Sequence, residues 1–580
     1  MLIISCLFCS NSSWGQNFDK IGNKGERASV SGGFQINSIG YAQSGLVTPS
    51  REPFTWFASG NVNVNILDVA LPFTFTYSNQ GGSYTQPFNR TAFHPSYKWA
   101  KAHIGLINMN FSPYTLTGHL FLGGGIELTP GNWKVMVMGG RLNKRIEYNS
   151  LEDNLNQLMF DRWGYGAKVG YSKKGYEGSI SFFKGQDNPN SLIFIPLNSE
   201  VKPQDNLSFS LEGKGKLTSK LHVEMSYALS ALTNNISLND SVNANQEIKF
   251  LHPIISGNSS TSAYHAYNTG LRYTAETMSV GINFEQIDPG YKTLGGYFFN
   301  NDLRNITITP TFTLFQKKLN VAINTGYQVN NLGEDKSATT SRWVGSLNAS
   351  YSNPQGLILN GSYSNFSTFT RNRPNTDPFY YGPADTLNFF QLSQNASLMT
   401  GYSFGSDSLK HSIQMVYNYQ VSENLTGNIN SVSAFGFGLE ELAPPIGVLT
   451  KVHSGNLNYA LQFPKSKTSI AIAANVNRSI SEAFESTFFG PTINLSKGLL
   501  NGKSTLSIGS TYNQQFSYNE LVGNVFNHRV SFSYSPEIKN KEIGIITFST
   551  NANLMQRLPT STTVTKINEF NIFVNLGYSF

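Results

Sequence analysis

Histidine serves in both metal sites and acid–base catalysis, and it occurs nine times in this sequence. The histidines are scattered, and they form neither an HExxH motif nor the paired spacing of a metal site. They are His94, His103, His119, His222, His252, His265, His411, His453 and His528. No serine or aspartate stands in a pattern that marks a nucleophile beside a base. We therefore expect no catalytic residue, no metal site and no cofactor, and we expect the protein not to be an enzyme.

A glycine run is the other feature that could carry chemistry. Gly123–Gly125 follows the strand-like segment Leu120–Leu122. A phosphate-binding loop would lead into a helix, and no helical pattern follows. We interpret the run as a curved or crowded strand.

The composition indicates the kind of fold that would position any site. Charged residues are 13% of the chain, about half the usual share in a soluble protein. Aromatic residues also reach 13%, there are 52 glycines, and Asn, Ser and Thr supply most of the polarity. This mixture suits a membrane-spanning β-barrel, which is apolar outside and polar inside. The net charge of +7 is spread without a Lys/Arg cluster, so we expect no nucleic-acid partner.

The last eleven residues carry the clearest strand pattern. One face is wholly apolar, and it consists of Phe570, Ile572, Val574, Leu576, Tyr578 and Phe580. The opposite face is mostly polar or small, because side chains alternate across a strand. Alternation that ends on a C-terminal Phe resembles the last strand of bacterial outer-membrane barrels, which the barrel assembly machinery reads.

From about residue 119 onward, strand-like stretches alternate with short and generally longer connections. The short ones are 129–132, 173–175, 218–219, 275–277, 316–318, 353–356, 405–408, 464–467, 500–502 and 538–541. The longer ones are 145–158, 185–204, 232–259, 288–301, 331–339, 370–386, 422–448, 479–484, 516–523 and 553–563. Outer-membrane barrels have short periplasmic turns and longer extracellular loops. The sequence therefore predicts an all-β transmembrane antiparallel β-barrel with Phe580 on the periplasmic side.

The two sets of connections imply 21 strands, and the stretch 97–111 adds one more. We expect about 22 strands, within a range of 20 to 26, and we place the barrel at residues 97–580. Residues 16–96 do not follow the rule, because a break near residues 67–68 would be a very short turn on the outer side. They form either a small plug or periplasmic piece, which we favour slightly, or extra strands of a larger barrel.

The first fifteen residues resemble a signal peptide cleaved near Gly15–Gln16, although a basic start is missing. A lipoprotein signal ending at Cys6 is the alternative. Both cysteines, Cys6 and Cys9, lie in this stretch, so we expect no disulfide and no Cys-ligated metal in the rest of the chain.

Three predicted external loops contain residues suited to contacts. Segment 370–386 combines arginine with aromatic side chains, which suits sugar or protein contact, although its tyrosines could instead belong to the interfacial girdle. Segment 422–448 is apolar and rich in glycine, and it either narrows the lumen, caps a partner or packs on its neighbours. For 288–301 we favour loop packing. The candidate contact residues are Arg371, Arg373, Phe379, Tyr380, Tyr381, Phe435, Phe437 and Leu439.

The short leader, the Asn/Tyr/Phe-rich hairpins and the ending Tyr578-Ser579-Phe580 together resemble large outer-membrane barrels of the Bacteroidota. The stretches 111–118 and 297–302 are similar to uncharacterised members. The resemblance implies a channel, or the membrane component of a surface or secretion-linked assembly, in the outer membrane of a Gram-negative bacterium. It implies outer-membrane lipid, the assembly machinery and a surface lipoprotein or secreted protein as partners. A TonB-dependent-type nutrient uptake receptor is the alternative, although we find no energy-coupling box.

Overall fold

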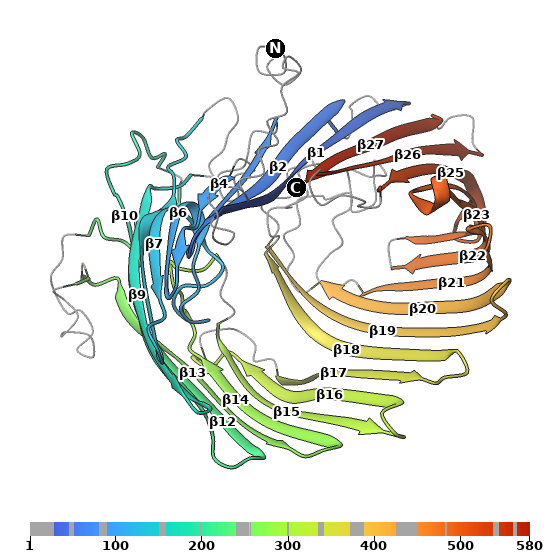
Figure 1. Cartoon of the computed structure of the whole chain (residues 1–580). Helices are drawn as coiled ribbons and strands as arrows, with labels where there is room; N and C mark the ends of the chain where they lie inside the picture. The colour runs from blue at the N-terminus through green and yellow to red at the C-terminus, as the bar shows by residue number, and fades with distance from the viewer. Residues whose placement is uncertain are drawn as a thin grey trace, which may run out of the picture.

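The fold is a closed wall of antiparallel strands, as Figure 1 shows. The computed structural model describes residues 28–45, 51–79, 90–149, 158–197, 199–238, 254–255, 257–297, 301–334, 341–371, 388–424, 449–481, 484–536, 544–560 and 565–580. Apart from β4 and β5, each strand pairs with its neighbour in the chain, and β27 pairs with β1 to close the wall. Within these residues, no helix is both long enough and apolar enough to cross a membrane.

The strands run as follows: β1 (Ala28–Ser44), β2 (Phe54–Ile66), β3 (Val69–Ser78), β4 (Arg90–Phe93), β5 (Ser96–Tyr97), β6 (Ala100–Asn108), β7 (Leu120–Leu128), β8 (Trp133–Asn143), β9 (Arg162–Lys173), β10 (Tyr176–Asp187), β11 (Asp205–Lys216), β12 (Leu221–Thr233), β13 (Thr261–Thr274), β14 (Met278–Ile287), β15 (Leu303–Leu314), β16 (Leu319–Asn330), β17 (Ser341–Ser352), β18 (Leu357–Arg371), β19 (Asn388–Gly405), β20 (Lys410–Asn424), β21 (Leu449–Phe463), β22 (Thr468–Ile480), β23 (Glu485–Leu499), β24 (Ser504–Ser517), β25 (Glu520–Tyr534), β26 (Ile545–Pro559) and β27 (Ile567–Ser579). One 3-10 turn, η5 (Leu500–Gly502), joins β23 to β24.

The wall has 26 strand positions, because β4 and β5 share one. Both pair with β3 on one side and with β6 on the other. His94 and Pro95 separate them. Pro95 has no N–H to donate, so a regular ladder cannot run through it.

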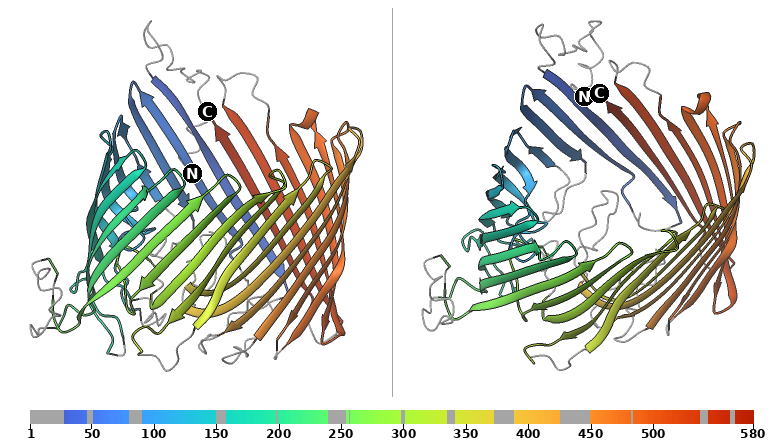
Figure 2. Two further views of the ribbon diagram at one scale, coloured as in Figure 1. Left: turned by 90° about the horizontal axis from the view of Figure 1, so that it is seen from below. Right: turned by 60° about the horizontal axis from the view of Figure 1, so that its bottom comes forward.

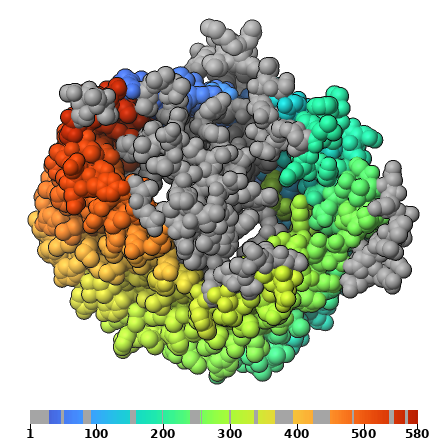
Figure 3. Space-filling model, turned by 180° about the vertical axis from the view of Figure 1, so that it is seen from behind, coloured from blue at the N-terminus to red at the C-terminus, as the bar shows by residue number. Residues whose placement is uncertain are grey.

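Closure joins the two ends of the described chain. Twelve residue pairs link β1 to β27, from Gly33 opposite Ser579 to Ser44 opposite Asn568. The backbones of Gly32 and Phe580 exchange hydrogen bonds of 2.9 and 3.0 Å, and the Phe580 ring stacks on Phe34. The strands slant across the wall in Figure 2, and the N-terminal (blue) and C-terminal (red) parts of the described wall adjoin in Figure 3. We call the end where β1 begins and β27 finishes the turn end, and the opposite end the loop end.

The outward face is apolar around the ring. Ile36 is 50% exposed, Ile493 51% and Leu576 44%, and a comparable outward side chain recurs on most strands. Aromatic side chains add to this face in pairs, such as Trp133 against Tyr171 and Tyr327 against Trp343. A water-soluble sheet would bury such a face under a second layer, whereas a membrane barrel presents it to lipid.

The fold confirms an all-β antiparallel barrel and corrects the strand count. From β7 to β27 the strands follow the sequence prediction, and Gly123–Gly125 lies within β7. A Cβ on Gly123 would come within 2.2 Å of the Gly139 carbonyl oxygen, which explains why glycine stands there. The expected count near 22 was too low, because 28–97 supply four more positions.

The interrupted strand caused most of that error. We read 80–90 as a loop and began the barrel at 97, which left out the position filled by β4 and β5. Each strand runs from one end of the barrel to the other, so omitting one strand from the count assigns every earlier connection to the wrong end. With it restored, the turn at Leu67–Asp68 lies at the turn end with the other short connections. The plug or periplasmic interpretation of 16–96 was therefore wrong for 28–45, 51–79 and 90–96.

One predicted long loop was also wrong. The expected connection 516–523 is a two-residue turn, Tyr518–Asn519, and both residues have positive φ, at 48° and 67°. Such turns match the twist of paired strands. The extended patterns on either side continue to Ser517 and resume at Glu520.

Candidate functional site: two sectors of the lumen wall

The inward face of the barrel divides into two sectors. The filled sector comprises the inward faces of β6–β14, over which two connections fold. The amide-rich sector comprises those of β15–β27 and β1–β3. Two clusters of buried apolar residues lie on the inward face of the barrel, between residues 92 and 303. A third cluster, which includes Leu207 and Ala231, lies on the outward face of β11 and β12. Among the described residues of the amide-rich sector, Leu303 at the start of β15 is the one member of these inward clusters.

Apolar side chains replace polar ones on the inward face of the filled sector near the loop end. Ile107, Phe121 and Phe183 are 0–2% exposed, and Met136 and Met138 lie beside them. Side chains of the β6–β7 connection pack onto this surface, including Phe111 and Leu116. Burial of this apolar area stabilises the connection inside the barrel.

Hydrogen bonds fix the β6–β7 connection, residues 109–119, to β9 and β14. The Lys168 ammonium on β9 donates to the Phe111 carbonyl oxygen and forms an ion pair of 2.8 Å with Glu212 on β11. The Tyr114 hydroxyl donates to Glu285 Oε1 on β14 at 2.8 Å. The connection therefore spans the inner surface from β9 to β14.

The described part of the β14–β15 connection, residues 288–297 and 301–302, lies against the first one. Leu116 forms a parallel bridge with Gly295, and the Thr117 amide donates to the Gly295 carbonyl oxygen at 3.0 Å. The Tyr291 hydroxyl donates to the Tyr114 carbonyl oxygen at 2.8 Å, and Tyr291 is fully buried. The two connections form one inner layer. Our preference for loop packing in this segment is confirmed for its described residues.

Asn206 on β11 secures this inner layer to the wall. Its side-chain amide donates to Ser230 Oγ at 2.7 Å, and its Oδ1 accepts from the Leu294 amide at 3.0 Å. Ser230 donates in turn to the Lys292 carbonyl oxygen at 2.6 Å. Asn206 is fully buried, so each of these bonds satisfies a polar group that water does not reach.

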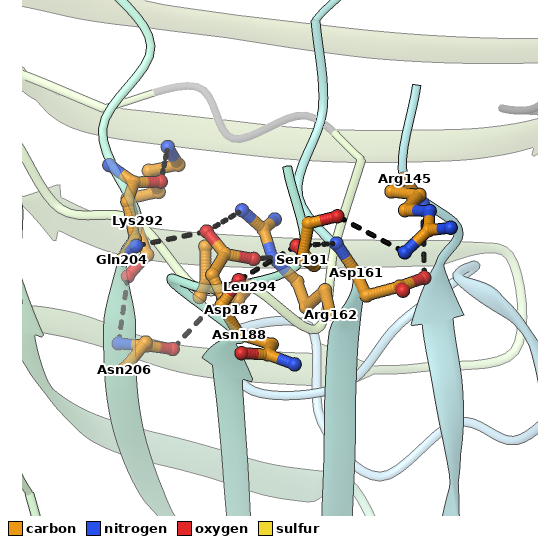
Figure 4. Close-up of polar contacts among 10 residues, drawn as sticks. All are labelled: Arg145, Asp161, Arg162, Asp187, Asn188, Ser191, Gln204, Asn206, Lys292 and Leu294. Carbon is orange, nitrogen blue, oxygen red and sulfur yellow. Dashed lines mark hydrogen bonds and ion pairs between the residues drawn. The ribbon is translucent and has the colours of Figure 1, made fainter. Parts of the chain in front are cut away.

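A polar network at the loop end connects the wall to the inner layer, as Figure 4 shows. Arg162 on β9 binds Asp187 on β10 through two bonds, of 2.7 and 3.0 Å, and the Asp187 side chain is 2% exposed. The Gln204 backbone N–H donates to the same carboxylate at 2.9 Å, and the Lys292 ammonium donates to the side-chain oxygen Oε1 of Gln204 at 2.8 Å. Asp187 thus links two strands, the β10–β11 connection and the inner layer.

A second part of the network joins the β8–β9 and β10–β11 connections. The Asp161 amide donates to Ser191 Oγ at 3.0 Å, and Arg145 donates to the Ser191 carbonyl oxygen at 3.3 Å. The Arg145 amide also donates to Asp161 Oδ1 at 3.0 Å. Charge-assisted bonds of this kind are stronger than neutral ones, and their planar geometry fixes the connections in register.

The inward charges of the filled sector are largely arranged as ion pairs. Lys134 lies 2.9 Å from Glu127, and Lys214 lies 2.8 Å from Glu177. The inward charged side chains of β6–β14 include Lys101, Glu127, Lys134, Arg162, Lys168, Glu177, Asp187, Glu212, Lys214, Glu224, Arg272 and Glu285. Six of these side chains are positive and six are negative, so together they carry little net charge.

Burial shifts the acid–base behaviour of the inner layer. Burial lowers the pKa of His119 to about 4, so its ring is neutral near pH 7. The ring stacks on Tyr297 at 4.1 Å, and Nδ1 donates to the Leu120 carbonyl oxygen at 2.7 Å. Burial, followed by the Glu285 carboxylate, raises the pKa of Tyr114. Burial likewise raises the pKa of Tyr291.

The amide-rich sector presents Asn, Gln, Ser and Thr to the lumen. Asn456 donates to Asn475 at 2.5 Å, and Asn475 donates to Thr492 at 2.7 Å, which bonds Thr511 at 2.8 Å. This series crosses β21–β24. Among the side chains that the structure describes in this sector, the inward charged ones are Lys410, Glu520, Arg529, Arg557 and Glu569. Charge is therefore sparse here compared with β6–β14.

The structure describes the predicted residues of the terminal strand but not the side chains of the predicted loop contacts. The terminal-strand residues lie on the outward face, where Phe570 and Phe580 are each 39% exposed. Arg371 is the last residue of β18. Its side chain, and all of Arg373, Phe379, Tyr380, Tyr381, Phe435, Phe437 and Leu439, lie outside the described residues. Their contact role stays a prediction.

Sequence reasoning missed the inner layer and its anchors. The one available signal was the aromatic and glycine-rich composition of 288–301, together with the similar stretch 111–118. Nothing in the sequence paired the two, since 177 residues separate Tyr114 from Tyr291. His94 and His103 are also in contact, with their Nδ1 atoms 2.9 Å apart, although no sequence motif paired these two histidines. Within the described residues, no group of three or more possible metal ligands is found.

The fold and the lumen define a large closed barrel with an apolar outside and a polar inside. No family model and no curated protein matches the sequence. Solved structures with some similarity include OccAB4 of Acinetobacter baumannii, at 10% identity over 73% of this chain and 100% of that chain, with a TM-score of 0.29. The FrpB iron transporter of Neisseria meningitidis (F5-1 variant) has 10% identity over 95% and 82%, with a TM-score of 0.37. The P pilus usher (PapC) translocation pore has 10% identity over 94% and 98%, with a TM-score of 0.33. At these values the likeness carries no function over to this chain.

Proposed function

We propose that this protein is a non-enzymatic outer-membrane channel of a Gram-negative bacterium, with its turn end in the periplasm and its loop end outside the cell. The observation that carries the proposal is the contrast between the two faces of one closed wall. Apolar side chains such as Ile36, Ile493 and Leu576 are exposed outward, while amides, hydroxyls and paired charges face inward. A wall of this kind is stable in lipid and encloses a hydrophilic lumen.

The inner layer sets the width of the path. Residues 109–119 and 291–295 occupy the lumen side of β6–β14 and are held there by buried bonds. A barrel of 26 strands is wide, because diameter grows with strand number. We infer that the inner layer narrows the lumen and that solutes move along the amide-rich sector.

Two measurements test the channel. The full chain should fractionate with the outer membrane and run faster on gels when unheated, as closed barrels do. In planar bilayers with KCl it should give discrete conductance steps. Recovery in the soluble fraction would contradict the membrane placement, and a silent bilayer with correctly assembled protein would contradict the channel.

The strand number argues against the alternative function, a TonB-dependent-type nutrient uptake receptor. Outer-membrane transporters with a plugged lumen have 22 strands. This wall has 26 positions, and part of the segment considered for a plug belongs to the wall. The uptake-receptor alternative is therefore less favoured than the channel.

A second candidate function, the membrane component of a surface assembly, is favoured by one exposed segment. In the β10–β11 connection, Ile193 is 88% exposed, Phe194 60% and Leu197 fully exposed. Contiguous exposed apolar residues often mark protein interaction sites. Pull-down from outer membranes should recover a surface protein with the native chain and lose it with Ile193→Ser/Leu197→Ser. Equal recovery with both chains would contradict this candidate.

We also propose that the barrel assembly machinery reads the terminal strand. Phe580 has a structural contact as well, since its ring stacks on Phe34 at 5.7 Å. Phe580→Ala should reduce the assembled fraction in cells more than Phe34→Ala, because both lose the stacking and only the first changes the terminus. Equal loss in the two variants would show that the stacking alone matters.

A further inference from the structure

Two recesses in the described part of the lumen wall lie in the amide-rich sector toward the turn end. One, of about 510 Å³, lies across β26, β27 and β1–β3. The other, of about 560 Å³, lies across β15–β19. Both volumes fall within the range of small-molecule sites. They are separate in the wall, so a shared chemistry between them is informative.

The first recess is formed where side chains are small. Gly577 stands between Gln35 and Thr547 in the register, and Gly33 stands opposite Ser579. The inward side chains that line it are Gln35, Ser59, Asn61, Thr74, Thr76, Thr547, Asn575 and Ser579. All are amides or hydroxyls, and none of its described lining residues carries a charge.

Polar groups beside this recess have unused bonding capacity. Asn37 is 2% exposed, and its Oδ1 accepts from Asn575 at 2.6 Å and from Gln35 at 3.3 Å. Its Nδ2 has no hydrogen-bond partner in the described part of the chain, and neither has Asn63 Oδ1. A buried polar atom without a partner is costly, and a ligand or water that bonds it removes that cost.

The second recess repeats this chemistry with different residues. Its inward lining consists of Thr311, Thr313, Asn320, Ala322, Asn348, Ser350, Asn360, Ser362, Ser397 and Met399. Ser350 Oγ donates to Asn360 Oδ1 at 2.7 Å, which orients the amide. As in the first recess, no charged side chain is among the described residues that line it.

The lining selects a chemical class of ligand. Amides and hydroxyls both donate and accept hydrogen bonds, as the hydroxyl groups of a sugar do. A charged ligand would lose hydration in the recess and gain no opposite charge. The opposite wall differs, because Glu177 and Lys214 there provide charges of both signs. We propose that the two recesses bind uncharged polyhydroxylated solutes, oligosaccharides in particular, as they cross the lumen. This inference rests on the proposed channel function for its role in transport.

The test compares two sugars of equal length on the full chain. Maltohexaose is uncharged and hexagalacturonate is anionic. Maltohexaose should interrupt the KCl current of single channels and should bind in detergent micelles by calorimetry, with at least tenfold higher affinity than hexagalacturonate. Calorimetry does not depend on conduction, so a silent bilayer with intact binding would count against the channel alone.

Variants locate the binding in the wall. Asn575→Leu/Asn360→Leu replaces one amide in each recess with an apolar side chain and should lower maltohexaose affinity at least tenfold. Lys214→Gln, on the opposite wall, should leave it unchanged. Should the leucine variant fail to assemble, Ser350→Ala/Ser362→Ala removes only two hydroxyls and should lower affinity about threefold. Equal binding of both sugars, or unchanged affinity in the recess variants, would overturn the proposal.

Discussion

The filled and amide-rich sectors share one wall but use their inward faces differently. In the filled sector, buried apolar side chains and the Arg162–Asp187 pair hold an inner layer in place. In the amide-rich sector, the inward side chains bond mainly to neighbours on adjacent strands, as Asn456 does to Asn475. The comparison teaches that the outward pattern makes the barrel, whereas the inward residues decide whether a stretch of wall anchors a layer or faces the solute. Substitutions in the first sector should therefore change structure, and those in the second should mainly change selectivity.

The largest difference between the sectors should follow from Asp187→Ala. It removes the acceptor of two Arg162 bonds and of the Gln204 amide, which leaves a guanidinium that is only 17% exposed without its carboxylate. Breaking a buried pair in this way costs about 3–5 kcal/mol. We expect a lower thermal midpoint and a several-fold larger single-channel conductance as the inner layer loosens.

The matched control lies in the other sector. Arg529 is an exposed inward charge that donates to Asn551 at 3.1 Å. Arg529→Ala should leave the thermal midpoint nearly unchanged. Similar losses in the two variants would remove the distinction between an anchoring and a solute-facing wall.

The second effect depends on pH and arises from His119. Unfolded histidine takes up a proton near its ordinary pKa of 6.5, whereas the buried ring resists protonation until about pH 4. The stability that depends on the neutral ring is therefore complete above pH 6.5 and is lost as the pH falls toward 4. The difference corresponds to roughly 3 kcal/mol at the acid end.

Conductance reports this change. It should rise between pH 6.5 and 4 as residues 109–119 loosen, and His119→Phe should remove that rise because the ring no longer titrates. His528, an exposed outward residue bonded to Ser510, provides the control. A pH response that persists in His119→Phe and disappears in His528→Phe would contradict the assignment.

The sequence predicted the wall more completely than its contents. Strands β7–β27 follow from alternation and loop length, because each hairpin carries its own pattern. The position filled by β4 and β5 could not be predicted in this way. β4 has four residues and β5 has two, and strands this short on either side of Pro95 show no alternation of apolar and polar side chains. The inner layer was beyond reach for another reason. Contacts such as Leu116 with Gly295 join segments far apart in the chain, and no local pattern encodes them.

A smaller effect should come from a single hydroxyl in the inner layer. Tyr114→Phe removes the donor to Glu285 and leaves a partly buried carboxylate with one bond fewer. We expect a loss of about 1–2 kcal/mol in the free energy of unfolding, together with a modest rise in conductance. Tyr512 donates to Asn524 at 2.8 Å on the other side of the barrel, so Tyr512→Phe is the matched change. It should affect stability less and leave conductance unchanged, and equal conductance changes would argue against the inner layer as the constriction.

The most specific effect on transport should come from Asn475. Asn475→Ala breaks its bonds to Asn456 and Thr492, which are neutral and only partly buried. Such bonds contribute about 0.5–1.5 kcal/mol each, so the barrel should stay assembled. Asn475→Asp keeps the shape but adds a negative charge to a wall where charge is sparse. It should shift the reversal potential in a KCl gradient toward cation selectivity, because a lumen with few fixed charges has little to offset one more. Adding a carboxylate to the filled sector with Ser226→Asp, beside Glu212 and Glu224, should shift it less, because paired charges already dominate that wall. A larger shift from Ser226→Asp would mean that ions follow the filled sector and that the amide-rich wall is not the path.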